Sequence, residues 1–166
     1  MEYEKLNSLI DVLNEESRIY ENILQISKDK TDVIIGGKVS ELDEMTKLEQ
    51  SFVIKIGKLE ILRENCIEEI SNQLNIKSSE LTVSELSEHL NEENSKKLID
   101  YKEKIGNILT ELKDINDLNS RLIKNSIDYI DFSLNILSSA TESNNNYGDN
   151  GEVNEEKKKT YMDLKL

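Results

Sequence analysis

The absence of proline is the feature that most restricts how this chain can fold. None of its 166 residues is proline, and proline would remove a backbone donor and clash with the preceding helical turn. A chain without proline can form long uninterrupted helices. Hydrophobic residues make up 36% and charged residues 33% of the sequence, a balance typical of long helices with narrow apolar stripes. The sequence therefore predicts an all-α protein.

Three long helices are expected where apolar residues recur at three- and four-residue steps. The first runs from about residue 3 to 35 and is stopped by Gly36-Gly37. The second runs from about residue 40 to 74, with the hydroxyl of Ser40 as its expected cap. The third runs from about residue 93 to 138, and its apolar seam turns polar in its second half.

A short helix is expected over residues 83–90. The preceding Thr82-Val83-Ser84-Glu85 is a capping box, in which a hydroxyl and a carboxylate satisfy orphan backbone donors. The helix from residue 93 to 138 would be roughly 65–70 Å long at 1.5 Å per residue, which is too long for a compact bundle. We therefore expect an elongated antiparallel helical hairpin or coiled-coil bundle, with three long helices and one short helix.

The helical pattern is expected to end near Ser138. Residues 141–156 are rich in Asn, Gly, Ser and acid, a composition typical of disordered segments. Three lysines follow at 157–159, and the sequence then ends in several apolar residues. We expect a helical domain over 1–138 and a flexible tail over 139–166 that contains a docking segment.

The charge and the lone cysteine restrict the partners and the compartment. The net charge is −13, from 34 acidic and 21 basic residues, so the chain is poorly suited to bind phosphate backbones or anionic membrane surfaces. No apolar run approaches 18 residues, and the N-terminus does not resemble a signal peptide. With Cys66 alone, no intramolecular disulfide can form. We expect a soluble cytoplasmic protein with no nucleic-acid partner and no membrane insertion.

Residues that could perform chemistry are scarce. His89 is the only histidine, and we expect it on the surface of the short helix. Cys66 falls on the apolar stripe of the second helix, where a buried inert thiol is expected. No phosphate loop, dinucleotide fingerprint or metal-spaced cysteine set occurs. The sequence therefore predicts no catalytic residues, no metal, no cofactor and no enzymatic activity.

Two pairs of polar residues interrupt the apolar seams. Glu49 and Arg63 lie two heptads apart in the second helix, and we expect each to extend past a narrow apolar stripe into solvent. Asn116 and Asn119 lie together where the third long seam should be apolar. They either fix the register of a buried helix or mark a stretch that receives a partner, and the pattern leaves both interpretations open.

The segment from Asn116 to Ser126 resembles the signature helix of the FlgN-type flagellar export chaperones, whose pattern is N-x-x-N-x-x-L-[LI]. Lys47-Leu48-Glu49 and Leu62-Arg63 are similar to parts of the second helix of that family. Tyr147-Gly148-Asp149-Asn150-Gly151 resembles the tyrosine–glycine patch that follows its last helix. The resemblance covers nearly the whole chain.

The resemblance implies a cytoplasmic type III flagellar export chaperone. It would bind the C-terminal helices of hook–filament junction proteins, prevent their premature assembly and deliver them to the export gate. The matching tyrosine patch implies gate docking by Tyr147, Gly148 and Gly151. Together with the polar decay of the seam, the asparagine pair predicts client binding by Asn116, Asn119, Leu122, Ile123, Ser126, Ile130 and Leu137.

Two other functions stay open at this point. One is a structural coiled coil or scaffold, for which apolar heptads would be expected to continue to the end of the third long helix. The other is a chaperone for a different client of type III secretion. The polar seam and the tyrosine-containing tail favour a chaperone, and the sequence does not identify the client.

Overall fold

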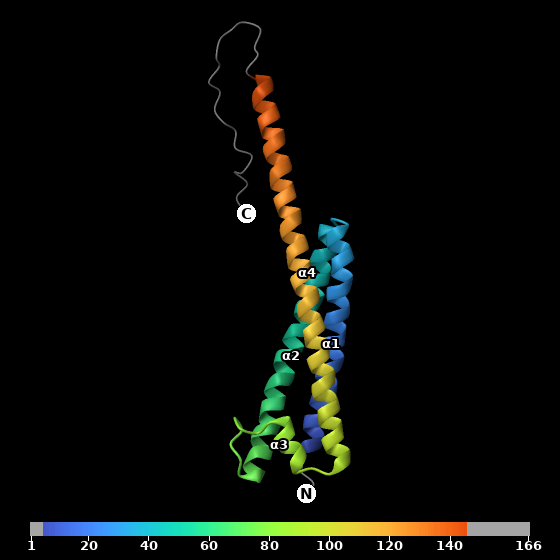
Figure 1. Ribbon diagram of the computed structural model, residues 1–166, viewed down its shortest axis with the longest axis vertical. Coiled ribbons are helices and arrows are strands. Elements are labelled where there is room, and N and C mark those ends of the chain that lie inside the picture. The colour runs from blue at the N-terminus through green and yellow to red at the C-terminus, as the bar shows by residue number, and fades with distance from the viewer. Residues whose placement is uncertain (1–4, 146–166) are drawn as a thin grey trace. The chain divides into compact units, whose positions relative to one another are not determined.

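The computed structural model describes residues 5–145, with side chains up to residue 139. These residues form α1 (Leu6–Ile35), α2 (Val39–Leu74), α3 (Val83–Glu88) and α4 (Glu92–Asn145), and no strand occurs among them (Figure 1). The predicted all-α fold of three long helices and one short helix is confirmed. The chain divides into two compact units, residues 1–123 and 124–166, so their boundary falls inside α4.

The turn between α1 and α2 is built on glycine. Gly37 has a φ of 65°, in the left-handed region that residues with a Cβ rarely adopt. The N–H of Lys38 donates to the Val33 carbonyl, and the N–H of Gly37 donates to the Ile34 carbonyl, both at 3.1 Å. This is a Schellman motif, which satisfies the last carbonyls of α1. The chain thereby reverses, and α2 runs antiparallel to α1 (Figure 1).

The predicted N-terminal cap is wrong for α2 and confirmed for α3. Ser40 is not the cap of α2, because the N–H of Leu42 donates to the Lys38 carbonyl at 3.0 Å. The first turn therefore closes earlier, and Ser40 lies inside the helix. Thr82 does cap α3, since the N–H of Glu85 donates to its Oγ1 at 3.1 Å.

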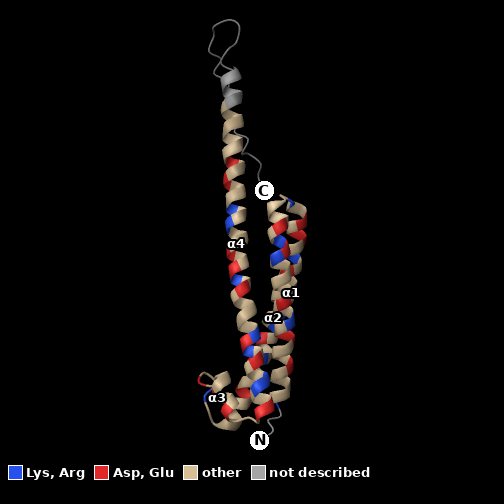
Figure 2. Cartoon of the chain, turned by 45° about the vertical axis from the view of Figure 1, so that its right-hand side comes forward, with Lys and Arg blue, Asp and Glu red and all other residues tan. Residues whose placement is uncertain are grey.

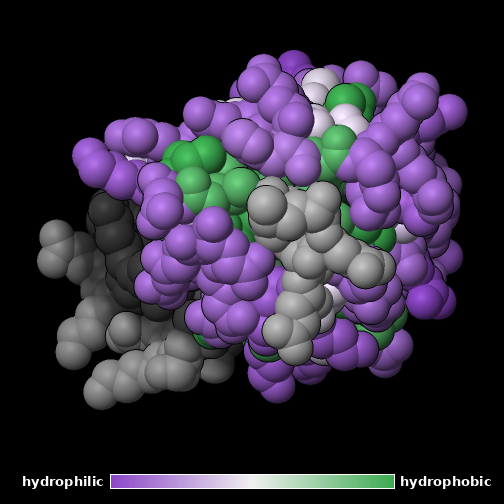
Figure 3. Space-filling view, turned by 90° about the horizontal axis from the view of Figure 1, so that it is seen from below, coloured by the Kyte–Doolittle hydropathy of each residue, from purple (hydrophilic) through white to green (hydrophobic). Residues whose placement is uncertain are grey.

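The hydrophobic core of the unit 1–123 lies where all four helices meet. Its buried members are Leu6, Leu9, Leu13, Cys66, Ile70, Leu86 and Leu98. Burial raises the pKa of the Cys66 thiol, which keeps the thiol protonated and unreactive. Seen from the end of the molecule near α3, hydrophobic side chains show only between larger areas of hydrophilic surface (Figure 3).

The last helix continues beyond the expected boundary near Ser138. α4 ends at Asn145, so residues 139–145 are helical rather than part of a disordered tail. Once a helix is nucleated, each further residue adds a backbone hydrogen bond, and the next glycine is Gly148. Ser, Thr and Asn are only moderately unfavourable in a helix, so their accumulation here does not end α4.

Candidate protein-binding site

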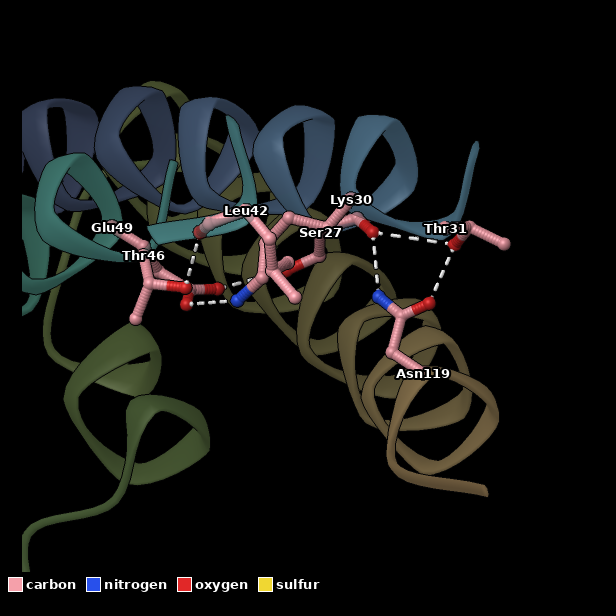
Figure 4. Close-up of polar contacts among 7 residues, drawn as sticks. All are labelled: Ser27, Lys30, Thr31, Leu42, Thr46, Glu49 and Asn119. Atoms are coloured by element: carbon pink, nitrogen blue, oxygen red, sulfur yellow. Dashed lines mark hydrogen bonds and ion pairs between the residues drawn. The ribbon is translucent and has the colours of Figure 1, made fainter. Parts of the chain in front are cut away.

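Ser27 is the residue at which α1, α2 and α4 are joined by polar contacts (Figure 4). Its side chain is fully buried. The hydroxyl donates to Glu49 Oε1 of α2 at 3.0 Å, and the carbonyl accepts a hydrogen bond from Asn119 Nδ2 of α4 at 2.8 Å. Because an unpaired buried polar group is costly, these bonds favour one register of the three helices. Ser27, Lys30, Thr31, Glu49 and Asn119 are called the polar junction below.

The remaining contacts of the polar junction satisfy its longer side chains. Thr31 Oγ1 donates to Asn119 Oδ1 at 2.7 Å, so both ends of the amide are paired. Lys30 Nζ donates to Glu49 Oε2 at 2.8 Å, and both of these side chains are largely buried. Glu49 was expected to extend into solvent, but its carboxylate connects α2 to α1 through both oxygens.

Arg63 also points to α1 instead of extending past the apolar stripe. Its Nη1 lies 3.6 Å from Oε2 of Glu16, a side chain that is only 2% exposed. Burial raises the pKa of Glu16, and the nearby Arg63 partly opposes this effect. Burial also raises the pKa of Tyr20, and the negative charge of Glu16 adds to the increase. Both polar residues of the second seam therefore contact α1.

An open groove of about 490 Å³ lies beside the polar junction. Its apolar lining comes from Tyr20 and Ile23 of α1, Val53 and Ile56 of α2, and Leu112 and Ile123 of α4. The helix pairs around it are held together by the junction, so the groove is a preformed feature of the unit 1–123. A groove with this lining can receive apolar side chains from another protein.

The predicted binding residues of α4 divide into buried and exposed members. Asn119 is 5% exposed and belongs to the polar junction, so the register-fixing interpretation applies to it. Asn116 is exposed at the edge of the groove, and Leu122 is half-buried. The remaining predicted residues are exposed: Ile123, Ser126, Ile130 and Leu137.

The structure adds two residues that the sequence pattern did not single out. Ile127 and Leu134 are exposed, and with Ile130 and Leu137 they follow steps of three, four and three residues along one face of α4. We call these four residues the first apolar stripe, and Ile123 precedes it with the same spacing. The sequence does contain the pattern of this stripe, because Ile127 follows Ile123 by four residues. The predicted site instead continues from Ile123 to Ser126, three residues later.

Some predictions cannot be placed on the structure. Tyr147, Gly148 and Gly151 lie outside the described residues. Among the described residues, no group of histidine, cysteine, aspartate and glutamate side chains could hold a metal ion. None of the helices in the described part is long and apolar enough to cross a membrane.

The antiparallel long helices, joined by the polar junction and a common hydrophobic core, define a helical bundle. Comparison with known proteins specifies its family. The FlgN protein family matches residues 1–155, so the chain belongs to the FlgN family. This family consists of flagellar export chaperones and is not enzymatic, and the general role of the protein is that of a flagellar export chaperone.

The chain is also similar to a curated bacterial protein. It is 26% identical over 140 residues to the "Uncharacterized protein YvyG" of Bacillus subtilis (strain 168), and the match covers 84% of each chain. No solved structure matches the chain.

Proposed function

We propose that this protein is a cytoplasmic chaperone that holds the C-terminal helices of hook–filament junction proteins. It keeps these clients from assembling prematurely and delivers them to the gate of the flagellar type III export apparatus. The first apolar stripe on α4 carries the proposal, because its four side chains are each more than half exposed. Apolar area of this kind gains free energy when a partner removes it from water.

The spacing of the stripe indicates which kind of partner it receives. Apolar residues at three- and four-residue steps match the apolar face of an amphipathic helix, and two such helices pack with their stripes facing each other. Ile123 lies both in this spacing and in the lining of the groove. We therefore propose that a client helix packs along the first apolar stripe, and that the groove receives apolar side chains of the client.

Asn119 and Asn116 have separate roles in this proposal. Asn119 is a positioning residue, because it holds α4 to α1 through Ser27 and Thr31. Asn116, on the exposed edge of the groove, is placed to contact the client directly. Leu122 and Ser126 border the same face of α4. The gate-docking role of Tyr147, Gly148 and Gly151 rests on their resemblance to the tyrosine–glycine patch of the family.

The proposed client site predicts that Ile123→Asp/Ile130→Asp abolishes client binding. A charge in a closing apolar contact is strongly disfavoured, and the loss should be at least about 2 kcal/mol, the scale of a binding hot spot. The measurement is a titration of the full chain with the C-terminal helical region of candidate junction proteins. Circular dichroism should show unchanged helix content.

Ile54→Asp/Ile61→Asp is a matched control for this experiment. These residues are also seven positions apart on one long helix, and they are 62% and 60% exposed, so the same two substitutions are made away from the proposed site. The control should bind the client normally. If the folded Ile123→Asp/Ile130→Asp variant also binds normally, the site lies elsewhere. If the wild-type chain binds no junction protein, the client belongs to another class.

A further inference from the structure

A second set of exposed apolar side chains lies on the same part of α4. Tyr129, Phe132 and Ile136 are all more than half exposed, and they are separated by steps of three and four residues. We call them the second apolar stripe. Phe132 lies two residues after Ile130 and two before Leu134, and two residues correspond to about 200° around a helix. The two stripes therefore face opposite sides of α4.

The two stripes do not follow the pattern of a helix that packs on a single neighbour. A helix that packs on one neighbour has one apolar face and a polar opposite face. Here, the residues between the two stripes on one side include Asp128 and Asp131, and no lysine or arginine occurs from residue 125 to 145. In Figure 2, the described part of α4 that follows its last blue residues is red and tan. The segment thus presents two apolar strips with acidic residues between them.

One straight partner helix cannot cover both stripes. A helix packs against another helix through one strip of its surface. The first stripe extends over about three turns, or roughly 15 Å, and the second over about two turns, or roughly 10 Å. Burial of both stripes therefore requires two helical segments, one on each face of α4. The acidic residues between the strips favour segments that carry lysine or arginine at their edges, because opposite charges are attracted at such short range.

Two other occupants fit the surface less well. A second copy of this chain would bring a net charge of −13 close to the same charge, and it would place acidic edges against acidic edges. An anionic membrane would be repelled by Asp128 and Asp131 and would meet no nearby cation on this segment. A partner with amphipathic, basic-edged helices has neither disadvantage.

We propose that the client engages α4 with two amphipathic helical segments, which pack on opposite faces of residues 127–137. The inference rests on the proposed function and specifies the form of the client: a chain whose C-terminal region supplies two basic-edged helices. A single helix on the first stripe would leave Tyr129 and Phe132 in water, whereas two segments bury all seven side chains.

Site-specific photo-crosslinking tests this arrangement. Benzoylphenylalanine is introduced into the full chain as Tyr129→benzoylphenylalanine or as Leu134→benzoylphenylalanine, and the variants are irradiated with the C-terminal region of a junction protein. We expect mass spectrometry to find two different client segments, one for each position. Val39→benzoylphenylalanine, at an exposed apolar position at the start of α2, is the control and should give no client adduct.

Binding measurements with single variants provide a second test. Phe132→Asp and Ile130→Asp should each weaken client binding by about tenfold or more, while Ile54→Asp should leave it unchanged. If both crosslinking positions label the same client segment, or if Phe132→Asp binds like wild type, the two-sided arrangement is overturned and the proposed function stands. If the wild-type chain binds no client, both proposals fail. Adducts to a second copy of this chain, or binding to phosphatidylglycerol vesicles alone, would also overturn the inference.

Discussion

Ser27 illustrates how a single small residue can join three helices. Its side chain is short enough to be fully buried between α1, α2 and α4, yet its carbonyl and hydroxyl provide an acceptor and a donor. A larger residue would separate the helices, and alanine would leave the Glu49 carboxylate with one bond fewer. The polar junction thus holds the register of long helices, which apolar stripes alone specify weakly because they repeat.

At the residue scale, Asn119→Leu should lower the free energy of unfolding by about 1–2 kcal/mol. The substitution keeps the branching and the number of side-chain heavy atoms but leaves the Thr31 hydroxyl without its 2.7 Å partner and removes a donor to the Ser27 carbonyl. Urea titration followed by circular dichroism measures the change. Asn116→Leu is the control, because this exposed residue should change stability by less than about 0.5 kcal/mol. Equal stability of the two variants would contradict a structural role for Asn119.

Glu16 predicts a pH dependence of stability. Burial raises its pKa in the folded state above the ordinary value of 4.5, so the folded chain keeps this proton at pH values where the unfolded chain has lost it. The folded state then binds more protons, and stability falls as pH rises from 4.5 through the raised pKa. Glu16→Gln removes this fall in stability, because glutamine does not ionise. Urea titrations at several pH values should therefore show the variant gaining relative to wild type across that window, and a constant difference would contradict the prediction.

At the scale of helices, two glycines predict opposite effects of the same substitution. Gly57 lies within α2, and a Cβ added there would meet no other atom within 4 Å, whereas Gly37 has a φ of +65°. Gly57→Ala should raise the free energy of unfolding by about 0.5–1 kcal/mol, because alanine favours the helix. Gly37→Ala should lower it by about 1–2 kcal/mol, because the left-handed conformation is strained for alanine. Thermal unfolding measures both changes, and a loss at Gly57 would indicate a contact absent from this structure.

The order and approximate ends of the helices could be predicted from the sequence because local signals determine them. The glycines after Ile35 and the cap at Thr82 act within a few residues. The end of α4 was predicted too early, because polar composition was interpreted as loss of helix. The burial of Asn119 could not be predicted, since its partner Ser27 is 92 residues away in the chain. The first apolar stripe could have been predicted from the sequence, because Ile127 and Leu134 continue the helical spacing of Ile123 and Ile130.

At the scale of the whole molecule, the net charge of −13 affects the rate at which the protein associates with charged partners. A strong acidic field favours solubility and attracts basic partners over a distance limited by salt. The client proposed above carries basic-edged helices, so its approach to α4 should be faster at low salt. The residues proposed for the gate follow α4 in the sequence, and the client residues lie within it. One chain could therefore hold both partners at the same time.

Tyr147→Ala should weaken binding to the cytoplasmic domain of the export gate without changing the fold or client affinity. Tyr147 lies between Asn146 and Gly148, outside the described residues. A tyrosine provides a large apolar body and a hydroxyl at low entropic cost, and it often anchors small interfaces. The adjacent glycine allows close approach of the backbone to a shallow pocket. The expected loss is about 1–3 kcal/mol, measured by titrating the gate domain with and without bound client. Tyr147→Phe separates the contribution of the aromatic ring from that of the hydroxyl, because it keeps the ring and removes the hydroxyl. Wild-type affinity of Tyr147→Ala in both titrations would show that another residue docks at the gate.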